Sequence, residues 1–196
     1  MGNIPSNEAM QLLQDGNKRF ATGNLAVKDI GPARRAELIS KGQNPFAIII
    51  TCSDSRVPPE LIFDCGLGDL FVIRTAGNVV DPVVMGSAEY AVEHLGTPLL
   101  VVMGHDKCGA VQATMDGGEA PGSIAALVSK IAPSAQKARD AGASCGDPYE
   151  KCCLENINST IGEIMESPIV QHFIKDGHLT VVGAKYYLGS GEVEFL

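Results

Sequence analysis

Residues 46 to 56 read Phe-Ala-Ile-Ile-Ile-Thr-Cys-Ser-Asp-Ser-Arg, an uninterrupted apolar run followed at once by a thiol, an acid and a base. A short run of branched side chains without polar alternation is typical of a strand that is covered on both faces. Residues 70–73, 99–103 and 179–182 form three more runs of this kind, and helical patterns separate them. The sequence therefore predicts an α/β fold: a mostly parallel central sheet of about four to five strands, flanked by helices.

Start signals for helices support this alternation. Each signal pairs an N-cap residue with proline at the first helical position. The three signals are Asp81-Pro82, Asp147-Pro148 and Ser167-Pro168. A fourth helical stretch contains Pro133, where the missing backbone N–H predicts a kink or a break.

The chain length of 196 residues and its 45% hydrophobic content are sufficient for one domain with a sizeable core. We expect residues 1–40 to form an N-terminal helical arm, 43–110 to form the core around a metal site, and 111–196 to supply the C-terminal helices and the last strands. The amphipathic helix of the arm is expected to pack outside the sheet or on a partner subunit.

Charge and hydropathy exclude several classes of protein. The net charge of -8, with basic residues scattered rather than clustered, argues against a nucleic-acid partner. The apolar runs are too short to span a bilayer, and the N-terminus lacks the pattern of a secretory signal. These features predict a soluble, cytoplasmic protein with no membrane partner.

Six cysteines in such a chain are better interpreted as reduced thiols than as a disulfide framework. Cys65, Cys145, Cys152 and Cys153 could form a second metal site, but small buried hydrophobes are the favoured interpretation. The adjacent pair Cys152 and Cys153 would point about 100° apart on a helix and so face different surroundings.

The remaining two cysteines and one histidine indicate a catalytic zinc site with one ion per subunit. Cys52 and His105 each follow a predicted strand, and Cys108 lies within one turn of His105. The carboxyl ends of parallel strands meet at one edge of the sheet, where open α/β sheets bind ligands. Two thiolates and one imidazole leave the fourth tetrahedral position of zinc open to water or substrate, whereas structural zinc is normally closed by four protein ligands.

Several ordered blocks of the chain resemble the β-class carbonic anhydrases. The blocks are residues 52–60 (CSDSRVPPE), 68–74 (GDLFVIR), 76–78 (AGN), 89–92 (EYAV) and 104–109 (GHDKCG), with a weaker match at 181–187. The resemblance implies that Cys52, His105 and Cys108 hold zinc, and that the reaction is the reversible hydration of carbon dioxide to bicarbonate and a proton.

Zinc lowers the pKa of its bound water toward neutrality, so that hydroxide becomes available to attack carbon dioxide. Two thiolates cancel the formal charge of the ion, and neighbouring groups must then help to orient the hydroxide. The resemblance implies that Arg56 pairs with Asp54, whose carboxylate accepts a hydrogen bond from the hydroxide. If the pair breaks, Asp54 can instead become the fourth ligand and close the site.

The resemblance also implies the residues that contact the substrate. Gln43 and the backbone N–H of Gly109 match donors to bicarbonate, and Phe71 and Tyr90 match pocket walls that are partly contributed across a dimer interface. A homo-oligomer built from dimers, as a dimer or a tetramer, is therefore expected. Some bacterial members have an inhibitory bicarbonate site built around a tryptophan; this chain has no tryptophan, and Ile49 occupies the equivalent place.

Two other functions remain open. Relatives with the same triad hydrolyse carbonyl sulfide or carbon disulfide, linear analogues of carbon dioxide. A zinc-binding protein without catalysis would need four fixed protein ligands and would have no need for Asp54 and Arg56, so the presence of both residues disfavours it.

Overall fold

The computed structural model describes residues 4–141 and 147–196. Within these residues, five strands form one sheet in the order β2-β1-β3-β4-β5. The strands are β1 (Ala47–Cys52), β2 (Leu70–Thr75), β3 (Leu99–His105), β4 (Thr180–Tyr186) and β5 (Val193–Phe195). Strands β1 to β4 are parallel and coincide with the four apolar runs, while β5 pairs antiparallel with β4. The predicted fold class is confirmed.

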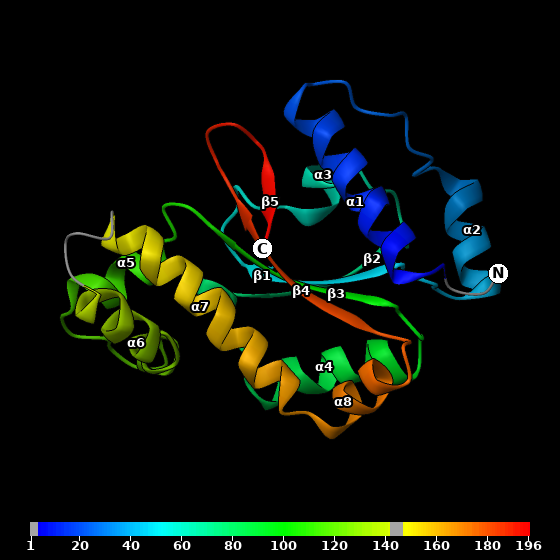
Figure 1. Cartoon of the computed structure of the whole chain (residues 1–196). Coiled ribbons are helices and arrows are strands. Elements are labelled where there is room, and N and C mark those ends of the chain that lie inside the picture. The colour runs from blue at the N-terminus through cyan, green and yellow to red at the C-terminus, as the bar shows by residue number, and fades with distance from the viewer. Residues whose placement is uncertain (1–3, 142–146) are drawn as a thin grey trace.

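Helices cover both faces of the sheet. They are α1 (Ser6–Ala21), α2 (Pro32–Lys41), α3 (Pro59–Ile62), α4 (Pro82–Glu93), α5 (Gly109–Asp116), α6 (Ile124–Asp140), α7 (Pro148–Met165) and α8 (Pro168–Lys175), with a 3-10 turn, η1, at Ala76–Asn78. Figure 1 shows α1 and α3 on one side of the sheet and α4, α7 and α8 on the other. The chain is thus a three-layer α/β domain.

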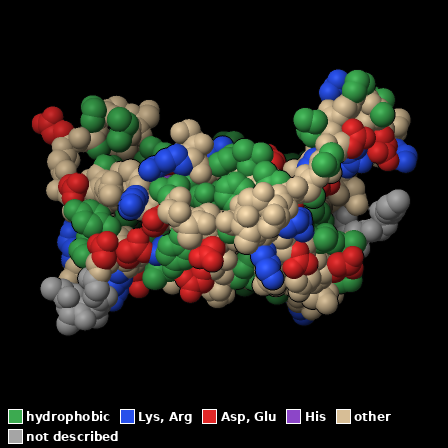
Figure 2. Space-filling model, turned by 90° about the horizontal axis from the view of Figure 1, so that it is seen from above, with side chains coloured by type: hydrophobic (Ala, Val, Ile, Leu, Met, Phe, Trp, Pro, Cys, Tyr) green, Lys and Arg blue, Asp and Glu red, His purple; other side chains and the backbone are tan. Residues whose placement is uncertain are grey.

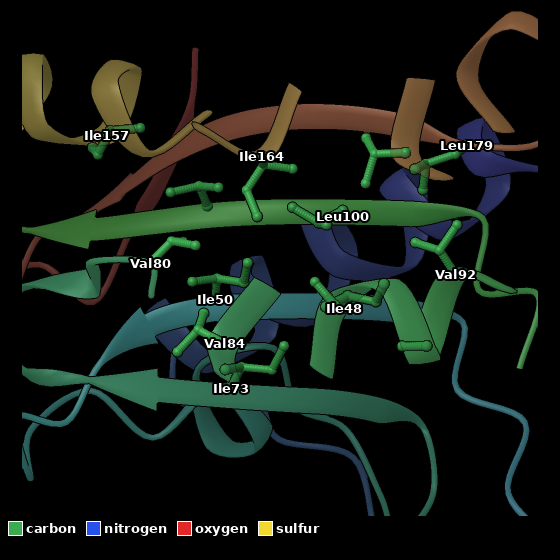
Figure 3. Packing of buried hydrophobic residues seen from close by; sticks show 14 of the residues in the cluster. Ile48, Ile50, Ile73, Val80, Val84, Val92, Leu100, Ile157, Ile164 and Leu179 are labelled. Carbon is green, nitrogen blue, oxygen red and sulfur yellow. The ribbon is translucent and has the colours of Figure 1, made fainter. Parts of the chain in front are cut away.

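Two apolar clusters, one on each face, explain why the strands have uninterrupted apolar sequences. In β1, Ile48 and Ile50 point toward α4 and α7, where Val84 and Ile157 lie in the same cluster (Figure 3). Ile49 points to the opposite face and packs in the cluster that includes α1 and α3. All six residues of β1 are buried, so no position on this strand faces water.

The predicted helix starts are confirmed, because Asp81, Asp147 and Ser167 each cap a helix through the side chain. The prediction for Pro133 was wrong in one respect: α6 continues through this residue as a single helix. Pro133 lies on the exposed side of α6, as does Ser129 one turn earlier. Because the carbonyl group that loses its partner is that of the exposed Ser129, water can satisfy it.

The N-terminal helix packs on its own chain. Ala9 and Leu13 of α1 are fully buried in the cluster over β1 and β3. Asn17 of α1 donates to the carbonyl groups of Ile62 and Gly191 and accepts from the N–H of Val193, so that the helix is joined to both α3 and the C-terminal hairpin. Of the two expected positions for this helix, packing outside the sheet is the one observed.

Charged side chains of both signs are exposed on the surface (Figure 2). On the face shown in Figure 2, lysine and arginine are mixed with acidic residues and do not form one basic stripe. None of the helices described, from α1 to α8, is both long enough and apolar enough to cross a bilayer.

Asp64 joins the arm to the rest of the domain. Its Oδ2 atom lies 2.5 Å from Arg19 Nε and 3.5 Å from Lys28 Nζ, and it accepts the N–H of Ala26 at 3.1 Å. Burial is the largest single effect and would raise the pKa of this carboxyl group, but the hydrogen bonds from Arg19 and Ala26 and the positive charges of Arg19 and Lys28 together lower the pKa.

We expect Asp64→Asn to reduce the free energy of unfolding at pH 7 by about 1–2 kcal/mol, since charge-assisted bonds are lost and Arg19 is partly exposed to solvent. A carboxyl group whose pKa is lower in the folded than in the unfolded protein stabilises the fold at pH values above its unfolded-state pKa. This stabilisation is lost as the pH falls toward the folded-state pKa, so the difference in unfolding free energy from wild type should shrink below about pH 4. Urea unfolding at several pH values measures this, with the exposed Asp15→Asn as control. A pH-independent difference would contradict the prediction.

Candidate metal centre

Three of the predicted ligands meet at the carboxyl edge of the sheet. Cys52 is the last residue of β1, His105 is the last residue of β3, and Cys108 caps the N-terminus of α5. Because β1 and β3 are parallel neighbours, their last residues arrive at the same edge. A left-handed residue, Lys107 (φ 51), turns the chain between His105 and Cys108.

The ligand atoms of this triad lie within 4.8 Å of one another, and all three residues are buried. Cys52 Sγ and Cys108 Sγ are 4.0 Å apart. Two sulfurs bound to one tetrahedral zinc at about 2.3 Å would be about 3.8 Å apart, so the spacing suits the ion. His105 Nδ1 is 2.8 Å from the carbonyl oxygen of Asp106, while its Nε2 has no hydrogen-bond partner in the described part of the chain. A buried nitrogen of this kind is explained by a cation between it and the two sulfurs.

Of the two thiols in the triad, Cys52 loses its proton first, because the hydrogen bond to Cys52 and burial raise the pKa of Cys108. The hydrogen bond from Cys108 is the main cause that lowers the pKa of Cys52 to about 4; His105 and the N–H donated by Gly77 contribute, while burial opposes them. Burial would lower the pKa of His105, but the Cys52 thiolate raises it above its usual value. Zinc binds deprotonated sulfur and neutral imidazole, and its positive charge favours both forms.

Asp54 and Arg56 lie beside the triad. Arg56 donates from Nε to Asp54 Oδ1 at 2.9 Å and from Nη2 to Oδ2 at 2.7 Å, and its backbone N–H also donates to Oδ1. Asp54 Oδ2 lies 4.0 Å from His105 Nε2. The Arg56 guanidinium holds the pKa of Asp54 well below its usual range, so this carboxylate is charged at neutral pH.

Other groups that support the triad could not be assigned from the sequence. Arg74 donates to the carbonyl oxygens of Cys52 and Asp54 and so fixes the loop between them. Gly77, which donates to Cys52 Sγ, has a positive φ of 74°. The block at residues 76–78 was part of the resemblance, but only the fold shows that its turn reaches the end of β1.

The predicted substrate residues divide into two groups. Gly109 begins α5, directly after Cys108, where the first N–H groups of a helix have no partner within it. Gln43 instead precedes β1, which begins at the opposite edge of the sheet and spans roughly 16 Å before it reaches Cys52. Phe71 lies near the amino end of β2 in contact with Tyr90, with ring centroids 6.3 Å apart. These three residues do not reach the triad of their own chain.

The remaining described cysteines are free thiols, and none of them belongs to a group that could hold a second metal ion within the described residues. Burial raises the pKa of Cys65 and Cys153 to about 12 and that of Cys152 to about 11, which makes these thiols inert. Cys152 packs in the cluster around the metal ligands and Cys153 in the cluster under the sheet, so the adjacent pair does face different surroundings. Cys145 lies outside the described residues.

Fold and site together define a class: a three-layer α/β protein with a buried cysteine–histidine–cysteine metal site at the carboxyl edge of its sheet. Comparison with known proteins agrees with this class. The family model described as carbonic anhydrase matches residues 47–193. The chain is 44% identical to a carbonic anhydrase of Mycolicibacterium smegmatis over 95% of this chain and 91% of that protein. It is 42% identical to carbonic anhydrase 2 of Mycobacterium tuberculosis, covering 93% and 89%.

Solved structures give the same result. A tetrameric β-carbonic anhydrase of Sordaria macrospora superposes with a TM-score of 0.77 at 25% identity, over 97% of each chain. The β-carbonic anhydrase CcaA superposes with a TM-score of 0.75 at 27% identity, over 95% of this chain and 98% of that one. The chain belongs to the β-carbonic anhydrase family, which confirms the resemblance stated from its sequence.

Proposed function

We propose that this chain is a zinc lyase that catalyses the reversible hydration of carbon dioxide to bicarbonate and a proton. The observation that carries the proposal is the three-residue triad with the charged carboxylate of Asp54 4.0 Å from its histidine nitrogen. Zinc held by Cys52, His105 and Cys108 would supply a water of lowered pKa as the nucleophile. A structural zinc would need a fourth protein ligand and would leave the Asp54–Arg56 pair without a role.

Asp54 and Arg56 act as a unit in this proposal. Arg56 occupies both oxygens of the carboxylate, which anchors it and keeps it ionised. An ionised Asp54 can only accept hydrogen bonds, so it orients the hydrogen of the attacking oxygen toward itself and a lone pair toward the substrate. The N–H groups of the first turn of α5, beginning at Gly109, together with the positive end of the helix dipole, favour the anionic product.

The resting state in this proposal has Asp54 paired with Arg56 and off the metal. The structure has this pairing, and the chain contains no tryptophan for an inhibitory bicarbonate site. Ile49, at the equivalent place, is fully buried in the core. A resting structure near neutral pH with an Asp54 oxygen bonded to zinc would overturn this part of the proposal.

Stopped-flow hydration of carbon dioxide with a pH indicator tests the activity. We expect the zinc-loaded protein to be active, the zinc-stripped protein to be inactive, and added zinc to restore the rate. Hydrolysis of carbonyl sulfide, assayed in parallel, distinguishes the alternative enzyme. Hydrolysis of the sulfur compound without hydration of carbon dioxide would replace the proposal with that alternative, and inactivity toward both would support the non-catalytic reading.

A homo-oligomer built from dimers completes the proposed site. Gln43 borders a surface groove with Arg34 and Lys41 of α2, at the end of the sheet opposite to the triad. The arm that includes α2 exposes apolar side chains of Val27 and Ile39. Since a site with both Gln43 and the triad cannot form within one chain, we propose that a second chain supplies Gln43, Phe71 and Tyr90. The tetrameric Sordaria relative supports association.

Mixing two inactive variants tests this sharing. Gln43→Ala and Asp54→Ala subunits, unfolded together and refolded, should form mixed dimers in which one of the two sites has an intact Gln43 and an intact Asp54. Random pairing by twofold symmetry should then restore about one quarter of wild-type activity. Activity no greater than the mean of the two separate variants would contradict a shared site.

A cytoplasmic location also belongs to the proposal, supported by the free thiols of the described cysteines.

A further inference from the structure

The turn that carries His105 and Cys108 is held mainly from outside itself. It contains only two residues between the ligands, and Lys107 is in the left-handed region. A turn this short does not by itself fix the direction of an imidazole ring. Besides the contact between the two cysteine sulfurs, its described external bonds come from the loop of Arg56, from helix α7 and from the C-terminal hairpin of β4 and β5.

Asp106 makes the bonds to the C-terminal hairpin. The last register pair of β3 and β4 joins His105 to Tyr186. Just beyond it, the backbone N–H of Asp106 donates to the carbonyl oxygen of Tyr186 at 3.1 Å. The carboxylate Oδ1 of Asp106 then accepts the N–H of Leu188 at 2.7 Å. The side chain thus continues the pairing of the two strands past the point where the chain turns toward Cys108.

The same residue orients the imidazole. The carbonyl oxygen of Asp106 lies 2.8 Å from His105 Nδ1. For Nε2 to bind a metal, Nδ1 must carry the proton and donate it to this carbonyl group. The bond to Tyr186 holds the backbone N–H of Asp106 and the bond to Leu188 holds its side chain, so together they restrict how this residue, and with it the carbonyl group, can rotate.

We infer that Asp106 is a positioning residue for the metal centre: through its bond to Leu188 it fixes the tautomer and direction of His105. The inference rests on the proposed zinc site and assigns a role to a residue that makes no contact with metal or substrate. It also makes the C-terminal hairpin, about 80 residues further along the chain, a support of the zinc site.

The test compares zinc affinity among variants by competition with a chromophoric chelator. Asp106→Ala removes the acceptor, and we expect zinc to bind about tenfold more weakly, at the lower end of the range for groups that support metal ligands. Asp106→Asn keeps an acceptor oxygen and should restore affinity to within about twofold of wild type. The visible spectrum of the cobalt-loaded protein should change in Asp106→Ala and stay as in wild type in Asp106→Asn.

Asp81→Ala is the matched control, because Asp81 also accepts backbone N–H groups, at the start of α4. It should lower thermal stability while zinc affinity stays as in wild type. Equal zinc affinity and cobalt spectra in Asp106→Ala and wild type would overturn the inference, as would failure of Asp106→Asn to restore both. If wild type itself does not bind zinc, the proposed function fails first, so the two failures are distinguishable.

Discussion

Replacement of Asp54 by alanine is expected to reduce carbon dioxide hydration by a factor of about 10²–10⁴ while zinc stays bound, the range for loss of a positioned acid or base group. Asp54 is not one of the three residues of the metal group, so the ion should remain at full occupancy. The loss arises because no charged acceptor then remains 4.0 Å from His105 Nε2 to orient the attacking oxygen. Stopped-flow rates, normalised to the measured zinc content of each sample, give the result.

The ratio of the Asp54→Ala hydration rate to the wild-type rate should be constant from about pH 6 to pH 9. Arg56 lowers the pKa of Asp54 in the folded protein, so the carboxylate is charged throughout this range and its effect is lost only as the pH falls through that lowered value. Asp140→Ala, which removes an exposed acid with one side-chain hydrogen bond from Gln136, is the control and should keep wild-type activity. Hydration by Asp54→Ala within about twofold of wild type would disprove the assigned role, since general acid–base and positioning groups contribute far more.

The sequence was sufficient to predict the parts of the fold that depend on local pattern. Every position of β1 is buried, so the strand has an uninterrupted apolar sequence that can be recognised without the structure. Asp81-Pro82 predicts a helix start because capping is a local interaction. The triad was also predictable, since Cys52 and His105 each end a strand and parallel strands end at one edge. Local pattern and tertiary structure agree at these positions.

Features that depend on long-range approach could not be predicted in this way. Pro133 indicated a kink or a break, and only its exposed position on α6 explains why the helix continues. Gln43 was grouped with the site by resemblance, yet the direction of β1 carries it to the opposite end of the sheet. The bond from Leu188 to Asp106 joins residues 82 positions apart, and no short motif contains both.

Gly16 is another such feature, and its replacement by alanine is expected to have the largest effect on stability. A glycine inside a helix predicts only a weak helix. In the structure, however, a Cβ atom on Gly16 would lie 1.9 Å from the carbonyl oxygen of Phe63 and 2.7 Å from its carbonyl carbon. Both atoms are backbone, so no side-chain rotation relieves the clash, and α1 must move away from the segment after α3.

We expect Gly16→Ala to lower the free energy of unfolding by about 3 kcal/mol or more, at or above the upper end for overpacking in a close-packed core. For a chain of this size the melting temperature should fall by roughly 10 °C. Gly162→Ala in α7 is the matched control, because a Cβ atom there meets nothing within 4 Å. It should leave stability unchanged or raise it by up to about 1 kcal/mol, since alanine favours a helix interior.

Displacement of α1 should also weaken the C-terminal hairpin, because the neighbouring Asn17 joins this helix to Gly191 and Val193. Hydrogen exchange should therefore be faster in Gly16→Ala than in wild type at the amides of β5, while the amides of β1, covered on both faces, change least. Equal melting temperatures for Gly16→Ala and Gly162→Ala would show that α1 adjusts to the added methyl group without loss of packing. That result would contradict a close, fixed contact between α1 and the chain at Phe63.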